Sequence, residues 1–228
     1  GFSTELGAEK FFNILCREGS IKPSAAVIVA TQDAIRTHGM ENLLKHASNV
    51  AKFGVPYAIA INRFIADNDD EIAEITKTLK DKNIPSFIAD VRDKGGKGGI
   101  DGAKMVIDLC KKENRFNFLY DLDETIEEKI SVIARELYGA DGVVFTDSAK
   151  DDIKDMERIG LSTLPVCIAK TPKSLSDNPA LTGAPKGFSV NVKAVRSSLS
   201  VVVPATEPPA DETTTASAFT LSALIRSL

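Results

Sequence analysis

The sequence is poor in the residues that hold metals and form disulfides. Its 228 residues include only three cysteines, Cys16, Cys110 and Cys167, and two histidines, His38 and His46. The cysteines are far apart and form no CxxC pair, which argues against a zinc site. Scattered cysteines of odd number are typical of small core residues in a reducing compartment. We therefore expect neither a disulfide nor a metal site.

The chain also lacks a surplus of charge and a long apolar run. Its 28 basic and 32 acidic side chains are interspersed and give a formal charge of -4, so no surface field points to nucleic acid or an anionic membrane. There is no signal-peptide pattern and no apolar span of 18 residues, which predicts a cytoplasmic protein without membrane contact. The hydrophobic content of 43% is enough for one large or two small cores.

Three apolar runs predict parallel strands: AAVIVAT (25–31), YAIAINRF (57–64) and PSFIADV (85–91). They are continuous rather than alternating, as in strands that are buried on both faces. Segments 40–54 and 67–83 lie between them and carry apolar residues three and four apart, which predicts helices. The order β-α-β-α-β predicts an α/β fold with parallel-sheet β-α-β units and flanking helices.

The second half of the chain repeats this alternation on a smaller scale. A helix is expected at 100–113 with Cys110 on its buried face, and helices at 125–139 and 149–160 alternate with strands at 142–146 and 165–170. A further strand is expected at 188–198, and the chain ends with leucines at helical spacing. We expect an α/β domain at 1–115, a smaller α/β domain at 116–198, and a divergent, irregular or disordered tail at 199–228.

Ligands of open α/β sheets bind outside the carboxyl ends of the strands. The stretch DVRDKGGKGGID (90–101) follows a predicted strand and precedes a predicted helix, but it matches neither GxGxxG nor GxxxxGK[ST]. Its glycines allow close approach of the backbone, and the helix from Ile100 offers free N–H groups. Lys94 and Lys97 would add charge for a carboxylate or phosphate. A plain glycine turn between strand and helix is the equal alternative.

Two further strand ends carry candidate residues. Phe64 either caps the core or offers a flat face to a planar ligand. The segment KTPKSLSDNP (170–179) is either a polar surface loop or a site for a ribose or phosphate. The acids from Asp67 to Glu71 are interpreted as the first turn of a helix rather than a metal site. No Ser-His-Asp set and no carboxylate pair stands out, so no catalytic residue is predicted, only a ligand-binding α/β protein.

Seven ordered stretches carry a family resemblance: GFSTELGAEKFFNI (1–14), FGVPYAIAINRF (53–64), KGGKGG (94–99), FLYDLDETIEEKI (118–130), ELYGADGV (136–143), LPVCIAKTPKSLSDNP (164–179) and PKGFSVNVKAVR (185–196). In this order they resemble the C-terminal half of formate tetrahydrofolate ligase (10-formyltetrahydrofolate synthetase), over residues 1–198. The resemblance implies a C–N ligase of one-carbon metabolism. With ATP and Mg²⁺, formate becomes formyl phosphate, and tetrahydrofolate then takes the formyl group to give 10-formyltetrahydrofolate.

The resemblance also implies a folate slot. Two phenylalanines of the family lie at the pterin ring, and Phe64 and Phe2 match them. A tryptophan is expected before the glycine turn, and Arg92 stands there instead; its guanidinium can stack on a pterin for about 0.5 to 2 kcal/mol. Lys94 or Lys97 would then lie near the glutamate of the folate.

A second implied site concerns the nucleotide. The K-T-x-x-S-L-S loop of the family lies near ATP, which implies nucleotide-binding roles for Lys170, Thr171 and Ser174. The P-loop of the family belongs to its N-terminal half, and this sequence contains none. We therefore expect a fragment that is inactive alone and that works with a missing P-loop half, as part of a homo-oligomer.

Some departures support another interpretation. About twenty residues fewer than in the family follow THG (37–39), and the sequence beyond Arg196 differs from the family's glycine-rich continuation. With Arg92, these departures favour a non-catalytic, degenerate homologue that serves as a folate-binding or subunit-interaction module.

Overall fold

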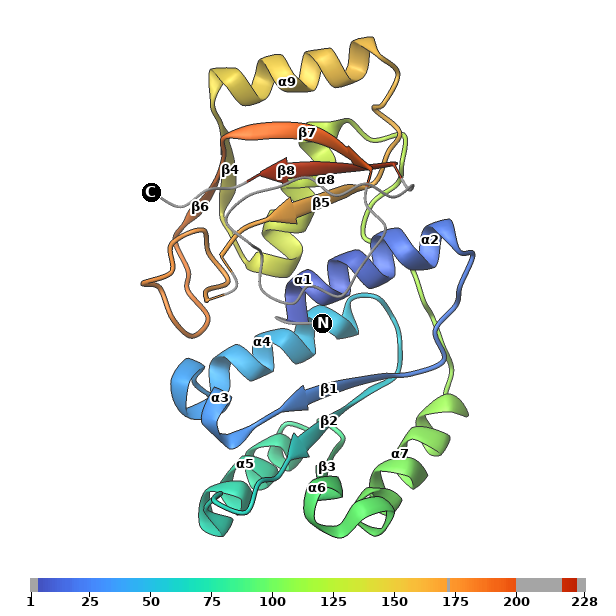
Figure 1. Cartoon of the computed structure of the whole chain (residues 1–228), viewed down its shortest axis with the longest axis vertical. Coiled ribbons are helices and arrows are strands. Elements are labelled where there is room, and N and C mark those ends of the chain that lie inside the picture. The colour runs from blue at the N-terminus through green and yellow to red at the C-terminus, as the bar shows by residue number, and fades with distance from the viewer. Residues whose placement is uncertain (1–3, 172, 200–218, 225–228) are drawn as a thin grey trace. The chain divides into compact units, whose positions relative to one another are not determined.

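The computed structural model describes residues 4–171, 173–199 and 219–224 (Figure 1). The chain divides into two compact units, one of Lys22–Asn117 and one of Gly1–Ile21 with Phe118–Leu228. The first expected domain, 1–115, ends close to this division, but its opening helix groups with the C-terminal residues. The reason is a buried contact far apart in sequence, in which Glu9 accepts hydrogen bonds from Tyr138 and from the amide of Ile168. The predicted tail lies largely outside the described residues.

The unit Lys22–Asn117 is built on a three-stranded parallel sheet in the order β1-β2-β3. The strands are β1 (Ala26–Ala30), β2 (Tyr57–Asn62) and β3 (Ser86–Ala89). In register, Ile28 lies beside Ile59, and Ile61 lies beside Ile88. The three predicted strands and the α/β class are confirmed.

The helices between these strands begin at identifiable caps. Helix α3 (Gln32–His38) begins after Thr31, whose hydroxyl accepts from the amide of Ala34, and α4 (Met40–Ala51) follows at Gly39. Helix α5 (Asp69–Asp81) begins after Asn68, whose side chain accepts from two backbone amides. Acids fill the first turn of α5 and Lys80 its last, which suits the helix dipole. The predicted acidic helix start is confirmed.

The two faces of this sheet are covered unequally. Helices α4 and α5 pack on the face that carries the buried Ile28 and Ile59, and α7 (Ile100–Cys110) contacts β2 and β3 on the other face. Beside α7, Val27 and Val29 of β1 are 41% and 64% exposed. The predicted burial of all three strands on both faces is therefore wrong, and only the central strand β2 fulfils it.

Helix α7 approaches the sheet through Gly102, where a Cβ atom would lie 2.4 Å from the ring of Phe87. Gly102 and Leu109 are the buried residues of α7, and they lie seven positions apart on one face. Cys110 is not part of the buried face formed by Gly102 and Leu109 and is exposed, so its predicted burial is wrong. Cys16 and Cys167 are buried, as expected.

The other unit begins with consecutive helical segments α1 (Thr4–Ala8), η1 (Glu9–Leu15) and α2 (Cys16–Glu18). After residue 118 follow α8 (Ile126–Ile133) and η3 (Ala134–Tyr138), then α9 (Asp147–Arg158). Helix α8 begins with a reciprocal capping box between Thr125 and Glu128. These helices confirm the predicted ones at 125–139 and 149–160.

The strands of this unit form two small sheets. Strands β4 (Gly142–Phe145) and β6 (Ser189–Val192) pair in parallel, and β5 (Val166–Ala169), β8 (Phe219–Leu224) and β7 (Ala194–Leu199) form the order β5-β8-β7. The predicted strand at 188–198 is thus two strands in different sheets. The predicted helical ending is wrong at 219–224, because that segment pairs in parallel with β5 and antiparallel with β7. In the described part of the chain no helix has the length and apolar character to cross a membrane.

Candidate functional site

The carboxyl ends of β2 and β3 bring two predicted ligand residues together. The amide of Arg63 donates to the carbonyl of Ala89 at 3.0 Å, which joins the segments that follow the two strands. The guanidinium carbon of Arg92 lies 5.5 Å from the centre of the Phe64 ring. Phe64 is half-buried and Arg92 is exposed. Phe64 is therefore not fully buried in the core, which was the alternative interpretation of this residue.

The distance between Phe64 and Arg92 is that of a direct cation–π contact. A planar ring between two stacked groups needs two gaps of about 3.5 Å, or about 7 Å in total. A heterocycle could enter only if the Arg92 side chain moved away from the ring by about 1.5 Å or more. No ion pair involves Arg92 within the described residues, so such a movement would break the contact with Phe64 and no salt bridge.

The glycine stretch forms a closed turn. It consists of α6 (Val91–Lys94) and a short 3₁₀ segment (Gly95–Gly99), which leads directly into α7. The amide of Asp90 donates to the carbonyl of Gly98 at 3.1 Å, and a Cβ atom at Gly98 would lie 2.0 Å from the Asp90 carbonyl oxygen. Only glycine fits at this position.

The two lysines of this turn differ in their contacts. Lys94 forms an ion pair of 2.7 Å with Asp90, whereas Lys97 is exposed and takes part in no ion pair within the described residues. Asp90 itself is buried at 7% exposure, and one of its carboxylate oxygens has no hydrogen-bond partner there. Asp90 was not among the site residues predicted from the sequence. Its sequence signals were its position at the end of the predicted strand 85–91 and its spacing of four residues from Lys94.

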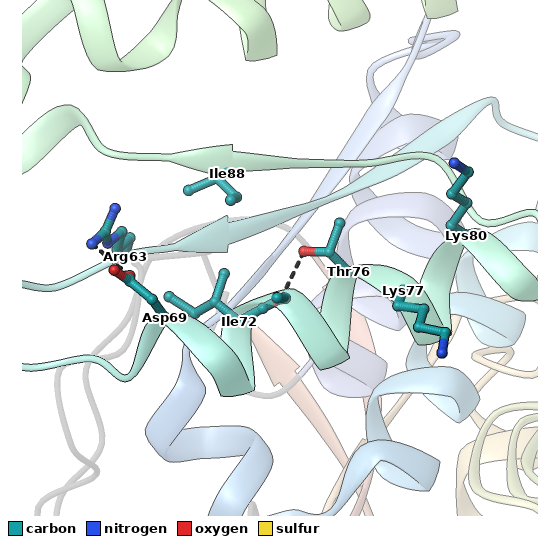
Figure 2. Close-up of a pocket in the computed structure, with 8 residues that line it drawn as sticks. Arg63, Asp69, Ile72, Thr76, Lys77, Lys80 and Ile88 are labelled. Carbon is teal, nitrogen blue, oxygen red and sulfur yellow. Dashed lines mark hydrogen bonds and ion pairs between the residues drawn. The ribbon is translucent and has the colours of Figure 1, made fainter.

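A groove lies beside these strand ends (Figure 2). It has a volume of about 450 Å³ and is lined by α5, by Ile88 of β3 and by Arg63. Arg63 forms an ion pair of 2.6 Å with Asp69 at one end of the groove, and Lys80 lies at the other end. The floor between them is apolar, with Ile72 and Ile88. This groove could not be predicted from the sequence, because its residues are brought together only by the packing of α5 along β3.

The predicted nucleotide-side residues lie in the other unit, and their polar groups bond within the chain. The Lys170 ammonium is fully buried, 3.4 Å from a carboxylate oxygen of Glu5, and donates to the carbonyls of Thr171 and Ser174. The Thr171 hydroxyl accepts from the amide of Lys173, and the Ser174 hydroxyl donates to the carbonyl of Leu181. Burial lowers the pKa of Lys170, although Glu5 opposes this shift. The hydrogen bonds of these three side chains to backbone groups hold the loop in its conformation.

A second buried carboxylate lies next to this lysine. Glu9 is fully buried and accepts from the Tyr138 hydroxyl at 2.7 Å and from the amide of Ile168 at 2.6 Å. Burial raises the pKa of Glu9 to about 7, although these two hydrogen bonds and nearby Lys170 act against the shift. Burial, followed by the charge of Glu9, raises the pKa of Tyr138 well above its ordinary value. Because Tyr138 keeps its proton at neutral pH, its hydroxyl is the donor in the hydrogen bond to Glu9.

Metal ligands do not gather anywhere in the described part of the chain, where no group of three or more His, Cys, Asp or Glu side chains could hold an ion. Burial raises the pKa of the Cys167 thiol to about 12, so it is inert as a nucleophile at neutral pH. Phe2, the second predicted pterin neighbour, lies outside the described residues.

These features define an α/β protein with a candidate ligand site at the carboxyl edge of a parallel sheet, where an aromatic ring, a guanidinium and a glycine turn meet. The family model of formate–tetrahydrofolate ligase matches residues 1–204. A formate–tetrahydrofolate ligase of Bacillus licheniformis is 41% identical over an alignment of 217 residues, and the match covers 87% of this chain and 39% of that protein. The chain belongs to the formate–tetrahydrofolate ligase family. It spans well under half the length of this relative.

Proposed function

We propose that this chain supplies the folate-binding part of an ATP-dependent formate–tetrahydrofolate ligase, which makes 10-formyltetrahydrofolate. The observation that carries the proposal is the pairing of Phe64 with Arg92 at the ends of two adjacent parallel strands, in a chain of this family. In this proposal the pterin ring stacks on Phe64, and Arg92 covers its other face. Phe2 would add a second ring, as the family resemblance implies.

The chemistry of formate activation needs groups that these residues do not offer. The sequence contains no GxxxxGK[ST] loop to hold the β- and γ-phosphates of ATP, and the described residues contain no carboxylate cluster for Mg²⁺. We therefore propose that formyl phosphate forms on protein beyond these 228 residues, which supplies the P-loop. The chain alone should then be inactive. Assembly as a homo-oligomer and a cytoplasmic setting remain predictions.

The nucleotide-side loop has a narrower role in this proposal. The Lys170 ammonium and the Ser174 hydroxyl donate within the chain, so these two side chains do not have a free charge or hydroxyl for ATP. The Thr171 hydroxyl accepts from the amide of Lys173, which fixes its position in the loop. The buried ammonium instead holds the loop backbone in one shape. We propose that the loop forms a preshaped wall beside the nucleotide.

A second candidate function is a non-catalytic module that binds folate or joins subunits. The replacement of the expected tryptophan by Arg92, and the direct contact of Arg92 with Phe64, favour this alternative. Both candidates include folate binding at Phe64. They differ in whether the chain restores ligase activity when the P-loop part of a family member is added.

Isothermal titration with tetrahydrofolate tests the slot in the full chain. Phe64→Ala should weaken binding by about tenfold, since stacking of a planar ring on an aromatic side chain contributes roughly 1 to 3 kcal/mol. Arg92→Trp should tighten it several-fold. Ile65→Ala is the matched control, because Ile65 is 83% exposed next to Phe64 and should change nothing.

The slot is disproved if the wild-type chain gives no binding heat, or if Phe64→Ala binds as the wild type does. A formate-dependent ATP hydrolysis assay then separates the two candidate functions. The ligase predicts no turnover by the chain alone and turnover after addition of a P-loop fragment from a family member. The module predicts none in either case.

A further inference from the structure

One face of strand β1 is left largely uncovered within the described residues. Side chains of this strand alternate, so that Ile28 and Ala30 are buried while Val27 and Val29 on the other face are exposed. Helix α7 covers that other face over β2 and β3, where Gly102 lies against the ring of Phe87. A helix is about 10 Å wide and strands lie about 4.8 Å apart, so one helix covers about two strands. The third strand lacks a helix of its own.

Helix α7 carries a second apolar surface that its own sheet does not use. Ile100 and Ile107 are exposed, and the stripe that they form includes Ala103 and Cys110, which are exposed as well. These four residues recur at intervals of three and four, so they lie on one side of the helix. A stripe of this kind is typical of a helix that packs against a further element.

This stripe faces the uncovered strand. Helix α7 runs back along the sheet (Figure 1), and beyond its end the side chain of Asn114 donates to the carbonyl of Pro23, shortly before β1. For a right-handed helix in this direction with Gly102 turned to the sheet, the stripe lies on the side of β1. Charged side chains occupy the opposite side of the helix: Asp101, Lys104, Asp108 and Lys111.

The exposed residues of both elements together form one apolar surface, which we call the α7–β1 seat. It consists of Val27, Val29, Ile100, Ala103, Ile107 and Cys110. Helix α7 has 11 residues, so the seat is about 16 Å long, which is the length of a helix of three turns. An occupant must be apolar toward two surfaces at once, one strand and one helix.

The outer edge of β1 is open as well. In the sheet order β1-β2-β3, this strand is an edge strand of the described residues. The amide of Ala26 donates to the carbonyl of Pro56 on the β2 side, so by alternation the amides and carbonyls of Val27 and Val29 point to the open edge. Exposed edges usually carry a lysine, a proline or a bulge that prevents pairing. The sequence of β1, AVIVA, has no such residue, and its register with β2 is continuous.

We propose that the open edge of β1 and the α7–β1 seat bind a strand and the amphipathic helix that follows it, supplied by the P-loop part of a formate–tetrahydrofolate ligase. This inference rests on the proposed function. A P-loop joins a strand to a helix in this order. The match covers only 39% of the relative, so most of such a ligase lies outside the matched region. The added strand pairs in parallel with β1, and its helix lies over Val27 and Val29, against the stripe of α7.

A second copy of this chain fits the seat less well. The helix α7 of a second copy already buries Gly102 and Leu109 on its own sheet. Only its single apolar stripe would remain, and that stripe cannot cover α7 and β1 of the first copy together. An amphipathic helix whose apolar face is still free can cover both.

The proposed arrangement places the two substrates at one edge of the sheet. A P-loop lies at the carboxyl end of its strand, where the helix N-terminus binds phosphate. A strand beside β1 is two strand spacings, or about 10 Å, from β2, and Phe64 follows the carboxyl end of β2. The acyl phosphate and the pterin would then lie close enough for transfer between bound ligands.

The test compares hydrogen exchange of the full chain alone and of the full chain co-expressed with the P-loop part of a family member. The amides of Val27 and Val29 should exchange at least about tenfold more slowly in the complex, because they become bonded within a sheet. Val29→Lys with Ile107→Lys should reduce co-purification at least about tenfold, since two charges enter the seat. Both residues are more than half exposed, so this variant should fold. Ile159→Lys is the matched control, at 53% exposure against 56% for Ile107.

Three results would overturn the inference. One is the failure of the wild-type chain to form a complex. Another is a complex in which Val27 and Val29 exchange as fast as in the chain alone, or which the double lysine variant forms as well as the wild type does. The third is slow exchange of these amides in the chain alone together with a dimeric mass by light scattering, which would assign the seat to a second copy. The proposed function fails separately, if the wild type binds no tetrahydrofolate while the complex still protects β1.

Discussion

Replacing Glu9 by glutamine should make the stability of this protein less dependent on pH. Glu9 is fully buried, and burial raises its pKa from 4.5 to about 7. The folded state therefore holds the proton over a pH range in which the unfolded chain has released it. At about 1.36 kcal/mol per pKa unit, this difference corresponds to ~3 kcal/mol.

The direction in which stability changes with pH depends on whether the folded or the unfolded state binds the proton of Glu9 more tightly. Below pH 4.5 Glu9 is protonated in both states, and its contribution to stability is fully present. Between pH 4.5 and 7 only the folded state keeps the proton, so the free energy of unfolding falls as the pH rises. Above pH 7 the stabilising contribution of Glu9 to the free energy of unfolding is fully lost. Glutamine keeps an acceptor for the amide of Ile168 and a polar group for Tyr138, but it has no proton to release.

Urea unfolding of the wild type and of Glu9→Gln, at a series of pH values from 4.5 to 8, measures this effect. The variant should gain ~3 kcal/mol relative to the wild type across this range, because the other titrating groups cancel in the difference. Glu127→Gln is the control, since Glu127 is an exposed carboxylate of the same unit. A difference between Glu9→Gln and the wild type that stays constant with pH would refute the reasoning.

Two further substitutions probe the glycine turn and the buried lysine. Gly98→Ala should lower the free energy of unfolding by about 2 kcal/mol, because its Cβ atom would meet the Asp90 carbonyl, whereas Gly96→Ala has open space; equal urea midpoints for the two variants would contradict this. Lys170→Met should cost roughly 3 kcal/mol, since it leaves the buried partner Glu5 without its cation. The exposed Lys173→Met should stay within about 0.5 kcal/mol, and a small loss for Lys170→Met would argue against the buried ion pair.

Local sequence patterns predicted the order of most helices and strands. The continuous apolar runs around Ile28, Ile59 and Ile88 became the three parallel strands, because β-branched residues between turn signals favour extended backbone. The acids before and within α5 predicted its start, since they interact with the helix dipole regardless of what the helix packs against. The helix of the opening residues and α3 were not predicted. The start signal of α3, the cap at Thr31, was assigned to a strand end.

The candidate site was predicted only in part. The strand-end rule and the family resemblance led to Phe64 and Arg92, and the structure places these two side chains in contact. The same reasoning expected free cations at Lys94 and Lys170, which are instead paired with Asp90 and Glu5. Asp90 lies four residues before Lys94, a spacing that the sequence does show. Glu5 lies 165 residues from Lys170, so the spacing of residues along the chain could not reveal that pair.

The sequence by itself determined most of the segments that became strands and helices, because backbone preference, capping and apolar periodicity act over a few neighbouring residues. Segment 219–224 is an exception, since its helical spacing gave way to pairing with β5 and β7. Tertiary structure alone decided which charges are neutralised and which surfaces are covered. Glu9 acquires its raised pKa only because the fold buries it, against the opposing hydrogen bonds from Tyr138 and Ile168, and the groove along α5 exists only because that helix lies beside β3. Burial and long-range pairing depend on residues that are far apart in the chain, and they decide both the electrostatics and the shape of the candidate sites.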